Sequence, residues 1–221
     1  MLYPDLRMEK LLLKERWTMM RSLSAKPVRL AGGAGIKVRS LRDGDVSLLQ
    51  ALYERVSPTT LYYRYLRPYQ PTLAEVAQLC RLRKDEGAGI IALVEGPQLQ
   101  AIGFAHYHID PQQPTTAEVG FLVEDRFQGQ GVGRTLFQHL VQRAQAQGIQ
   151  TFTAYVHPTN HAMLRVFQRS SLPLVMQFVD GLHEVRITLR PTGKGRSTVG
   201  RHAEALLRRS IVRHFGDKVG V

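Results

Sequence analysis

The sequence contains a single cysteine, Cys80, in 221 residues. One thiol cannot form an intrachain disulfide or a cysteine zinc cluster, and such scarcity is typical of a reducing compartment. The chain also lacks an apolar run of the roughly 18 residues that a membrane span needs, and the leucines at 11–13 are too few for the core of a secretory signal. We therefore expect a cytoplasmic protein with no transmembrane segment, in which Cys80 is a small buried residue on a helix.

Acidic residues are also scarce, with 18 Asp and Glu against 30 Lys and Arg, which gives a formal net charge of +12. Most of this excess lies at the two ends: residues 1–35 carry a net +4, residues 36–190 a net +3 and residues 191–221 a net +5. A mildly basic central region suits a ligand with several phosphates. Neither end shows the aromatic interleaving or the motif of a nucleic-acid reader, so we expect no specific nucleic-acid partner.

Hydrophobic residues make up 43% of the chain, enough for one domain with a buried core. We place this domain at 36–190. Residues 1–35 are expected to form a basic amphipathic helix followed by a glycine-rich linker at 25–35, and residues 191–221 a basic tail with a short amphipathic helix. Two roles are open for these amphipathic segments. They can pack on the domain or on each other, or they can contact an acidic partner, nucleic acid or an anionic membrane. A homo-oligomer is also possible.

The apolar periodicity predicts a mixed α/β domain. Asp43 is expected to cap one helix, Ser57-Pro58 to begin a second, and the pair Thr72 and Glu75 to form a capping box on a third that runs through Leu82. Strands are expected at 36–41, 90–95, 98–109, 117–123, 151–156, 174–179 and 182–190, with further helices at 132–147 and from 159 or 160. The short links predict an antiparallel meander over 90–123, the crossover helix makes 151–156 parallel to 117–123, and Asp180-Gly181 predicts a hairpin.

Between the strand ending at Val123 and the helix beginning at Val132 lie three glycines at alternating positions, Gly129, Gly131 and Gly133. Glycines let the backbone turn so that several N–H groups point at one spot, where the helix dipole and Arg134 add positive character. The sequence lacks a P-loop, and a dinucleotide-binding loop would need its third glycine at 134. A loop without a ligand is the alternative. The preceding strand and the following amphipathic helix favour a phosphate site.

The run Gln128-x-x-Gly131-x-Gly133 resembles the pyrophosphate-binding motif of the GCN5-related N-acetyltransferases, the GNAT family, which cradles the diphosphate of acetyl-CoA. The order of predicted elements over 36–190 is similar to that family, and Ser57 to Leu66 resembles a segment of the Pat-type bacterial protein-lysine acetyltransferases. The resemblance implies a mostly antiparallel sheet with a splayed parallel pair, whose gap takes the pantetheine arm of acetyl-CoA. It implies cofactor contacts from Phe121, Leu122, Val123, Gln128, Gly129, Gln130, Gly131, Val132, Gly133, Arg134 and Asn160. Ser171-Leu172 departs from the subgroup, which has Gly-Phe there, and we expect an altered turn.

For catalysis, a lysine amine with a pKa near 10.4 must lose a proton before it attacks a thioester. Glu118 is the candidate general base, because Pat-like domains place the base at this position; we expect it partly buried among Val119 and Phe121, with a raised pKa. A strand residue in a salt bridge is the alternative, and His157 is a second-rank base. Tyr155, Tyr107 or a water can protonate the leaving thiolate, because Phe167 stands where relatives have a tyrosine. Asn160 can contact the pantetheine arm or simply cap its helix.

His106 and His108 share a strand face but lack a third ligand at useful spacing, so we predict no metal. The sequence thus predicts an N-acetyltransferase that moves an acetyl group from acetyl-CoA to a primary amine in a ternary complex, since Cys80 lies far from the cofactor loop. A protein lysine is the preferred acceptor. A small-molecule amine, and a CoA-binding regulatory module without catalysis, are the alternatives.

Overall fold

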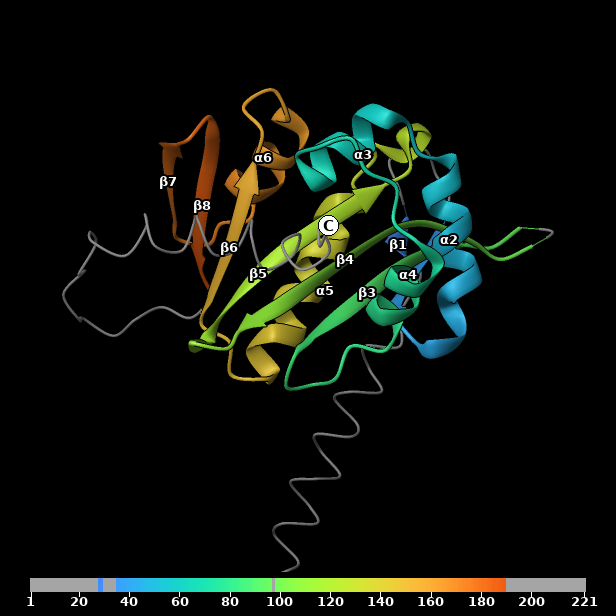
Figure 1. Cartoon of the computed structure of the whole chain (residues 1–221), viewed down its shortest axis with the longest axis horizontal. Helices are drawn as coiled ribbons and strands as arrows, with labels where there is room; N and C mark the ends of the chain where they lie inside the picture. Colours follow the sequence, from blue (N-terminus) through green and yellow to red (C-terminus); the bar gives the residue numbers. More distant parts are fainter. Residues whose placement is uncertain (1–27, 30–34, 97, 190–221) are drawn as a thin grey trace, which may run out of the picture. The chain divides into compact units, whose positions relative to one another are not determined.

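A computed structural model describes residues 28–29, 35–96 and 98–189 (Figure 1). In this part of the chain, eight strands form one sheet of order β1-β2-β3-β4-β5-β6-β8-β7, and helices flank it. The strands are β1 (Val28–Arg29), β2 (Gly35–Ser40), β3 (Gly87–Val94), β4 (Gln100–Asp110), β5 (Gln113–Val123), β6 (Thr151–Val156), β7 (Leu174–Val179) and β8 (Leu182–Thr188). The helices are α2 (Val46–Arg55), α3 (Pro58–Tyr65), α4 (Leu73–Cys80), α5 (Val132–Ala146) and α6 (His161–Gln168), with short 3-10 turns η1 (Asp43–Asp45) and η2 (Asp125–Phe127).

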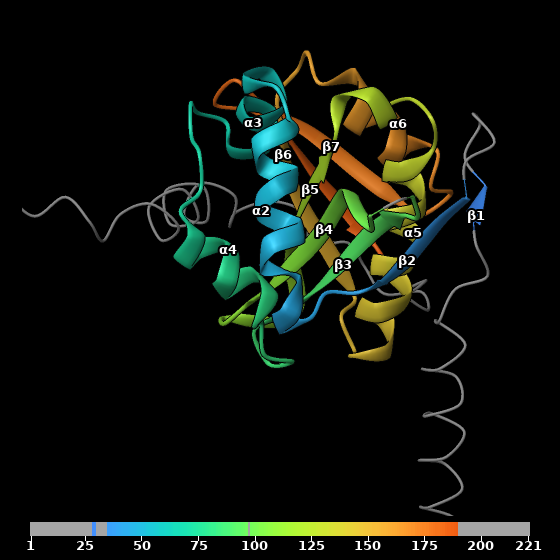
Figure 2. The same cartoon turned by 90° about the vertical axis from the view of Figure 1, so that its right-hand side faces the viewer.

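The sheet separates two apolar cores. Figure 2 shows α2 and α4 on one side of the strands and α5 on the other. Because successive side chains of a strand point to opposite faces, β4 serves both cores: Phe104 packs with the α2 and α4 residues, whereas Ala105 and Tyr107 pack with those of α5. Cys80 is buried in the α2 and α4 core, as the sequence predicted.

The parallel pair β5 and β6 separates along its length. The two strands pair only from Thr116 with Thr151 to Glu118 with Thr153, although β5 continues to Val123 and β6 to Val156. Figure 1 shows them diverging from a common end. The predicted antiparallel meander β3-β4-β5 and the predicted parallel pair are both confirmed, and so is the mixed, mostly antiparallel α/β fold with its splay.

Local signals in the sequence located most element boundaries. Ser57 caps α3 by accepting from the Thr60 N–H at 3.2 Å, and Thr72 and Glu75 form the predicted capping box. The turn at Asp180-Gly181 has φ angles of +50° and +81°, which is the combination that a two-residue hairpin of the predicted kind requires.

Three boundary predictions are wrong for identifiable reasons. Asp43 does not cap α2, because it lies in the turn η1 and the N-cap position of α2 is Asp45. The Asp45 side chain accepts a hydrogen bond from the Arg42 N–H and does not cap the helix. Helix α4 ends at Cys80 rather than Leu82, where the Arg81 N–H turns back to the Gln78 carbonyl. Strand β1 lies inside the predicted linker, since main-chain pairing with β2 needs no apolar periodicity.

The predicted amphipathic helices at the two ends lie outside the described residues. Among the helices that the structure describes, none has the length and apolar character to cross a membrane.

Candidate functional site

The glycine-rich loop joins η2 to α5 at the carboxyl end of β5. Gly129 and Gly131 have φ angles of +72° and +96°, in the left-handed region, and Gly131 stands at the N-cap of α5. The first N–H groups of a helix have no intrahelical acceptor, and the dipole makes this end positive. Arg134 is exposed in the first turn of α5. The loop therefore has the geometry and polarity of a phosphate-binding site.

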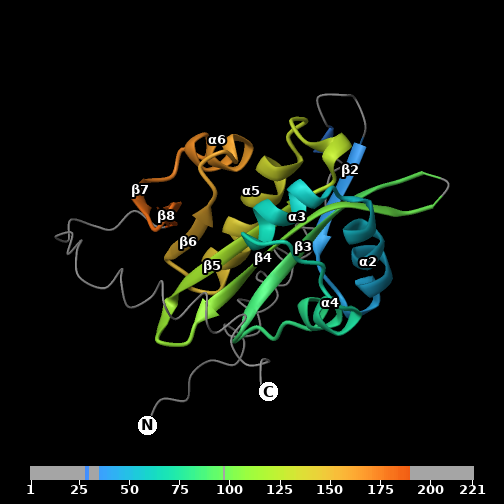
Figure 3. The same cartoon turned by 45° about the horizontal axis from the view of Figure 1, so that its top comes forward.

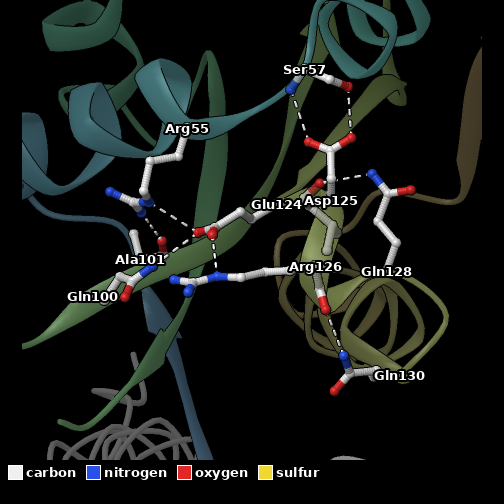
Figure 4. A network of polar contacts seen from close by, with 10 residues as sticks. Arg55, Ser57, Gln100, Ala101, Glu124, Asp125, Arg126, Gln128 and Gln130 are labelled. Carbon is white, nitrogen blue, oxygen red and sulfur yellow. Dashed lines mark hydrogen bonds and ion pairs between the residues drawn. The ribbon is translucent and has the colours of Figure 1, made fainter.

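Two glutamines brace this loop from within. The Gln128 side-chain amide donates to the Val123 carbonyl and to the Thr60 hydroxyl, both at 3.0 Å. The Gln130 amide donates to the Arg126 carbonyl at 2.7 Å (Figure 4). These contacts give both predicted residues a role in shaping the loop, which leaves the loop backbone as the surface that meets a ligand.

Asp125, which the sequence analysis did not single out, ties α3 to the same loop. Its carboxylate accepts from the Ser57 N–H at 2.8 Å, from the Ser57 hydroxyl at 2.6 Å and from the Thr60 hydroxyl at 2.8 Å. Partial burial by itself raises the pKa of Asp125, but these hydrogen bonds outweigh it and leave the pKa below its usual value. The Pat-like segment that begins at Ser57 therefore docks directly on the chain that leads into the glycine-rich loop.

A buried carboxylate holds the base of this loop. Glu124 is 4% exposed. Its carboxylate accepts hydrogen bonds from Arg55 at 3.1 Å and from Gln100 at 3.0 Å, and it also forms an ion pair with Arg126 (Figure 4). Arg55 also donates to the Ala101 carbonyl at 2.7 Å. Because a buried carboxylate is stable only when paired and hydrogen-bonded, this cluster fixes the end of β5 against α2 and β4.

Glu118 lies at the point where β5 and β6 begin to diverge, opposite Thr153. The predicted burial of Glu118 is wrong, because its side chain is exposed. The alternation along β5 gives the reason: Val119 and Phe121 point to the α5 core on the opposite face. Glu118 instead shares its face with His108, its cross-strand partner on β4.

Tyr155 lies on the same face as Glu118, since it is two residues beyond Thr153 on β6. Burial is the main cause that raises its pKa to about 12, with the carboxylates of Glu184 and Glu118 adding to it. Tyr107, the other candidate acid, is 0% exposed in the α5 core and donates its hydroxyl hydrogen bond to Gln147. The structure thus brings Tyr155 and Glu118 together and places Tyr107 away from them.

Most of the remaining predicted cofactor residues have side chains that pack inside the domain. The side chain of Phe121 packs against Phe137 and Phe167, and that of Leu122 is buried in the α2 and α4 core. Val132 is likewise buried, and Gly133 lies close to Val166 of α6. Asn160 caps α6 by accepting from the Met163 N–H at 3.1 Å, so the capping role weighed for it is observed.

The two histidines, His106 and His108, lie next to Arg64 of α3. Arg64 donates to His106 Nε2 at 2.9 Å, and the His106 and His108 rings lie 5.0 Å apart. A Cβ on Gly120 would lie 2.6 Å from the Arg64 guanidinium carbon, so the absent side chain at 120 makes room for this arginine. The residues that the structure describes include no group of three or more His, Cys, Asp or Glu side chains able to hold a metal ion.

A parallel strand pair that splays beside a glycine-rich loop at a helix start defines the class of acyl-CoA N-acyltransferases. The chain belongs to the acetyltransferase (GNAT) family, whose family model matches residues 49–171.

Known relatives place the chain near the Pat proteins. Acetyltransferase Pat of Mycolicibacterium smegmatis is 30% identical over 143 residues, which cover 65% of this chain and 43% of Pat. The chain therefore spans less than half the length of that relative. The crystal structure of the GNAT domain of S. lividans PAT superposes with a TM-score of 0.67 at 29% identity, over 74% of this chain and 96% of that domain. The fold also matches yncA of Salmonella typhimurium, solved with its cofactor acetyl-CoA, with a TM-score of 0.58 at 15% identity, over 74% of this chain and 98% of yncA.

Proposed function

We propose that this protein transfers the acetyl group of acetyl-CoA to a primary amine, preferably a lysine side chain of a protein. The observation that carries the proposal is the divergence of β5 from β6 at Glu118. One strand then presents a carboxylate, lines the gap suited to the pantetheine arm, and leads into the phosphate-binding loop. The names of Pat and the acetyl-CoA bound to yncA support this assignment.

In the proposed reaction, the acceptor ammonium first gives a proton to Glu118, directly or through a water. The neutral nitrogen attacks the acetyl carbonyl, the N–C bond forms, and the C–S bond breaks to release the CoA thiolate. The nitrogen passes its second proton to that thiolate, directly or through a water, so that the products are the amide and the CoA thiol. Tyr155 donates a hydrogen bond to that thiolate. Because its pKa of about 12 lies well above the usual range of a thiol, Tyr155 keeps its proton and stabilises the leaving group as a donor.

The state of Cys80 supports direct transfer in a ternary complex. Burial, followed by the charges of Asp45 and Asp43, raises the pKa of Cys80 to about 11. A buried thiol with this pKa is almost wholly protonated at neutral pH and is a poor nucleophile. Steady-state kinetics should therefore give intersecting lines, whereas parallel lines together with an acetylated Cys80 contradict direct transfer.

The first test replaces Glu118 with glutamine. We expect Glu118→Gln to lower acceptor-dependent CoA release at neutral pH by about two orders of magnitude, with the affinity for acetyl-CoA unchanged. The matched control is Glu95→Gln, which alters an exposed carboxylate in the turn after β3. CoA release is followed with a thiol reagent and acetyl-CoA binding by calorimetry. Equal rates for Glu118→Gln and the wild type would remove Glu118 from the mechanism.

The acceptor class is tested by incubating the protein with cell lysate and labelled acetyl-CoA. Label in proteins supports a lysine acceptor, whereas label confined to small molecules supports the alternative amine. If lysine peptides, polyamines and aminoglycosides all fail to stimulate CoA release while acetyl-CoA binds, the protein is a CoA-binding module and the proposed function is wrong.

A further inference from the structure

A groove lined by aromatic side chains runs along α3, outside the gap between β5 and β6. Its walls include Tyr62, Tyr63, Pro68, Tyr69, His157 and Thr159. The ring centroids of Tyr62 and Tyr63 lie 5.7 Å and 5.9 Å from that of His157, so the three rings form one cluster. Tyr62 is 36% exposed, so its ring is accessible to a ligand in the groove.

His157 contributes a fixed polar group to this groove. The backbone N–H of Thr159 donates to His157 Nδ1 at 3.3 Å, and the Thr159 hydroxyl lies 2.8 Å from the same nitrogen. Because a backbone N–H is always a donor, Nδ1 accepts and the ring proton resides on Nε2. The Thr159 hydroxyl also lies 3.0 Å from the Tyr63 hydroxyl, so Tyr63, Thr159 and His157 form one hydrogen-bonded chain.

The groove reaches the end of β6 through His157. His157 follows directly after β6, which ends at Val156 at the open end of the splayed gap. Helix α3 is held on the β5 side by Asp125, through Ser57 and Thr60, and on the β6 side by Thr159, through Tyr63. Figure 3 shows α3 above the strands at this end of the sheet. Helix α3 therefore connects the segments that follow β5 and β6, and the groove lies along this helix.

We propose that this groove binds the segment of the acceptor protein that flanks the target lysine, as an extended peptide with an apolar residue beside that lysine. The inference rests on the proposed function. An apolar side chain fits against Tyr62, and the His157 Nε2–H is placed to donate to a main-chain carbonyl of the peptide. Such a site combines aromatic and apolar walls with a few polar groups, among them His157, Glu54 and Gln70, as specific binding sites do. A small amine needs only the gap and makes no contact with Tyr62.

The test compares two acceptors that present the same amine. One is a peptide of about ten residues with a single lysine next to leucine; the other is Nα-acetyl-lysine methylamide. We expect Tyr62→Ala to lower kcat/KM for the peptide at least about fivefold through KM, as loss of an aromatic anchor does, and to leave the small acceptor within about twofold. His157→Phe, which keeps a ring but removes the Nε2–H, should weaken binding of the same peptide when that binding is measured without turnover. Phe178→Ala, an equally large truncation of an exposed ring on β7, is the matched control.

Equal losses for both acceptors in Tyr62→Ala, or unchanged kinetics for both in that variant, overturn the proposal. In the second case, sedimentation measures whether a second copy of the chain covers the groove instead. Binding of the fluorescently labelled peptide, measured without turnover, separates this proposal from the proposed function. A peptide that binds the wild type, fails to bind Tyr62→Ala and is never acetylated supports the groove and contradicts the acetyltransferase activity.

Discussion

At the scale of single residues, Tyr155 has a protonation state that limits what it can do. Its pKa of about 12, raised first by burial and then by neighbouring carboxylates, keeps the phenol protonated throughout the neutral range. The hydroxyl can therefore donate a hydrogen bond to a thiolate over that whole range. We expect the pH profile of kcat to show no decline from Tyr155 until the pH approaches its pKa.

This role predicts a moderate effect for Tyr155→Phe. Loss of one hydrogen bond to a charged group should lower kcat about tenfold, while the affinity for acetyl-CoA stays the same. The control is Tyr107→Phe, because Tyr107 is a buried tyrosine on the opposite face of the sheet that bonds to Gln147. Tyr107→Phe should lower the melting temperature and leave kcat near that of the wild type; the reverse pattern would identify Tyr107 as the group that acts on the thiolate.

For Glu118, the sequence predicted the correct strand but the wrong burial of the side chain. The motif spacing locates Glu118 beside the cofactor loop, and the structure puts it where β5 and β6 separate. Burial depends instead on which strands and helices cover that face, and this arrangement is set by contacts between distant parts of the chain. Val119 and Phe121, the neighbours expected to bury Glu118, necessarily point the other way in a strand.

At the scale of elements, the ion pair between Arg39 and Asp45 joins the end of β2 to the start of α2. Arg39 donates through both terminal nitrogens to Asp45, at 2.6 Å and 2.7 Å, and Asp45 is buried. Burial by itself raises the pKa of Asp45, but the hydrogen bonds and charges of Arg39 and Arg42 outweigh it and lower the pKa below 3.8. Because the folded state binds the proton less tightly than the unfolded state, this pair stabilises the fold above pH 3.8, and that stability is lost as the pH falls through the lowered pKa.

Asp45→Asn should therefore reduce the free energy of unfolding by about 2–3 kcal/mol at neutral pH, with the difference from the wild type shrinking below pH 3.8. The control is Asp85→Asn, whose ion pair with Arg83 at 2.8 Å is largely exposed and should contribute less than about 1 kcal/mol. Denaturant unfolding at several pH values measures both variants. A difference that persists unchanged at strongly acid pH would show that the charge of Asp45 is not the cause.

The elements also show which parts of the site could be predicted from sequence. The loop from Gln128 to Gly133 and the caps at Ser57 and Thr72 depend on residues close in the chain, so their local patterns located them. The contact of Asp125 with Ser57 and Thr60 joins segments 65 or more positions apart. Arg64 and Gly120 also meet although they are far apart in the sequence. Such pairings follow from the packing of α3 on β5, which no local pattern encodes.

At the scale of the whole molecule, we expect ligand binding and folding to be linked through the glycine-rich loop, because this loop connects β5 to α5 and contacts α3. A ligand that binds only the folded chain stabilises it by about 2.7 kcal/mol when its concentration is one hundred times its dissociation constant. For a domain of this size, each kcal/mol raises the melting temperature by about 2–4 °C. Acetyl-CoA should thus raise the melting temperature of the wild type by about 5–10 °C at that concentration.

Variants of the loop test whether this stabilisation arises at the predicted phosphate site. Gly131 has a φ of +96° and nothing within 4 Å of an added Cβ, so Gly131→Ala acts through backbone strain rather than a clash. We expect this variant to lose most of the shift in melting temperature caused by acetyl-CoA, because the strained loop no longer directs its N–H groups at the diphosphate.

Gly44→Ala is the control, since Gly44 also has open space around it but no left-handed φ. Glu118→Gln should keep the full shift, because binding and proton transfer use different groups. A Gly131→Ala protein that responds to acetyl-CoA as strongly as the wild type would place the cofactor elsewhere.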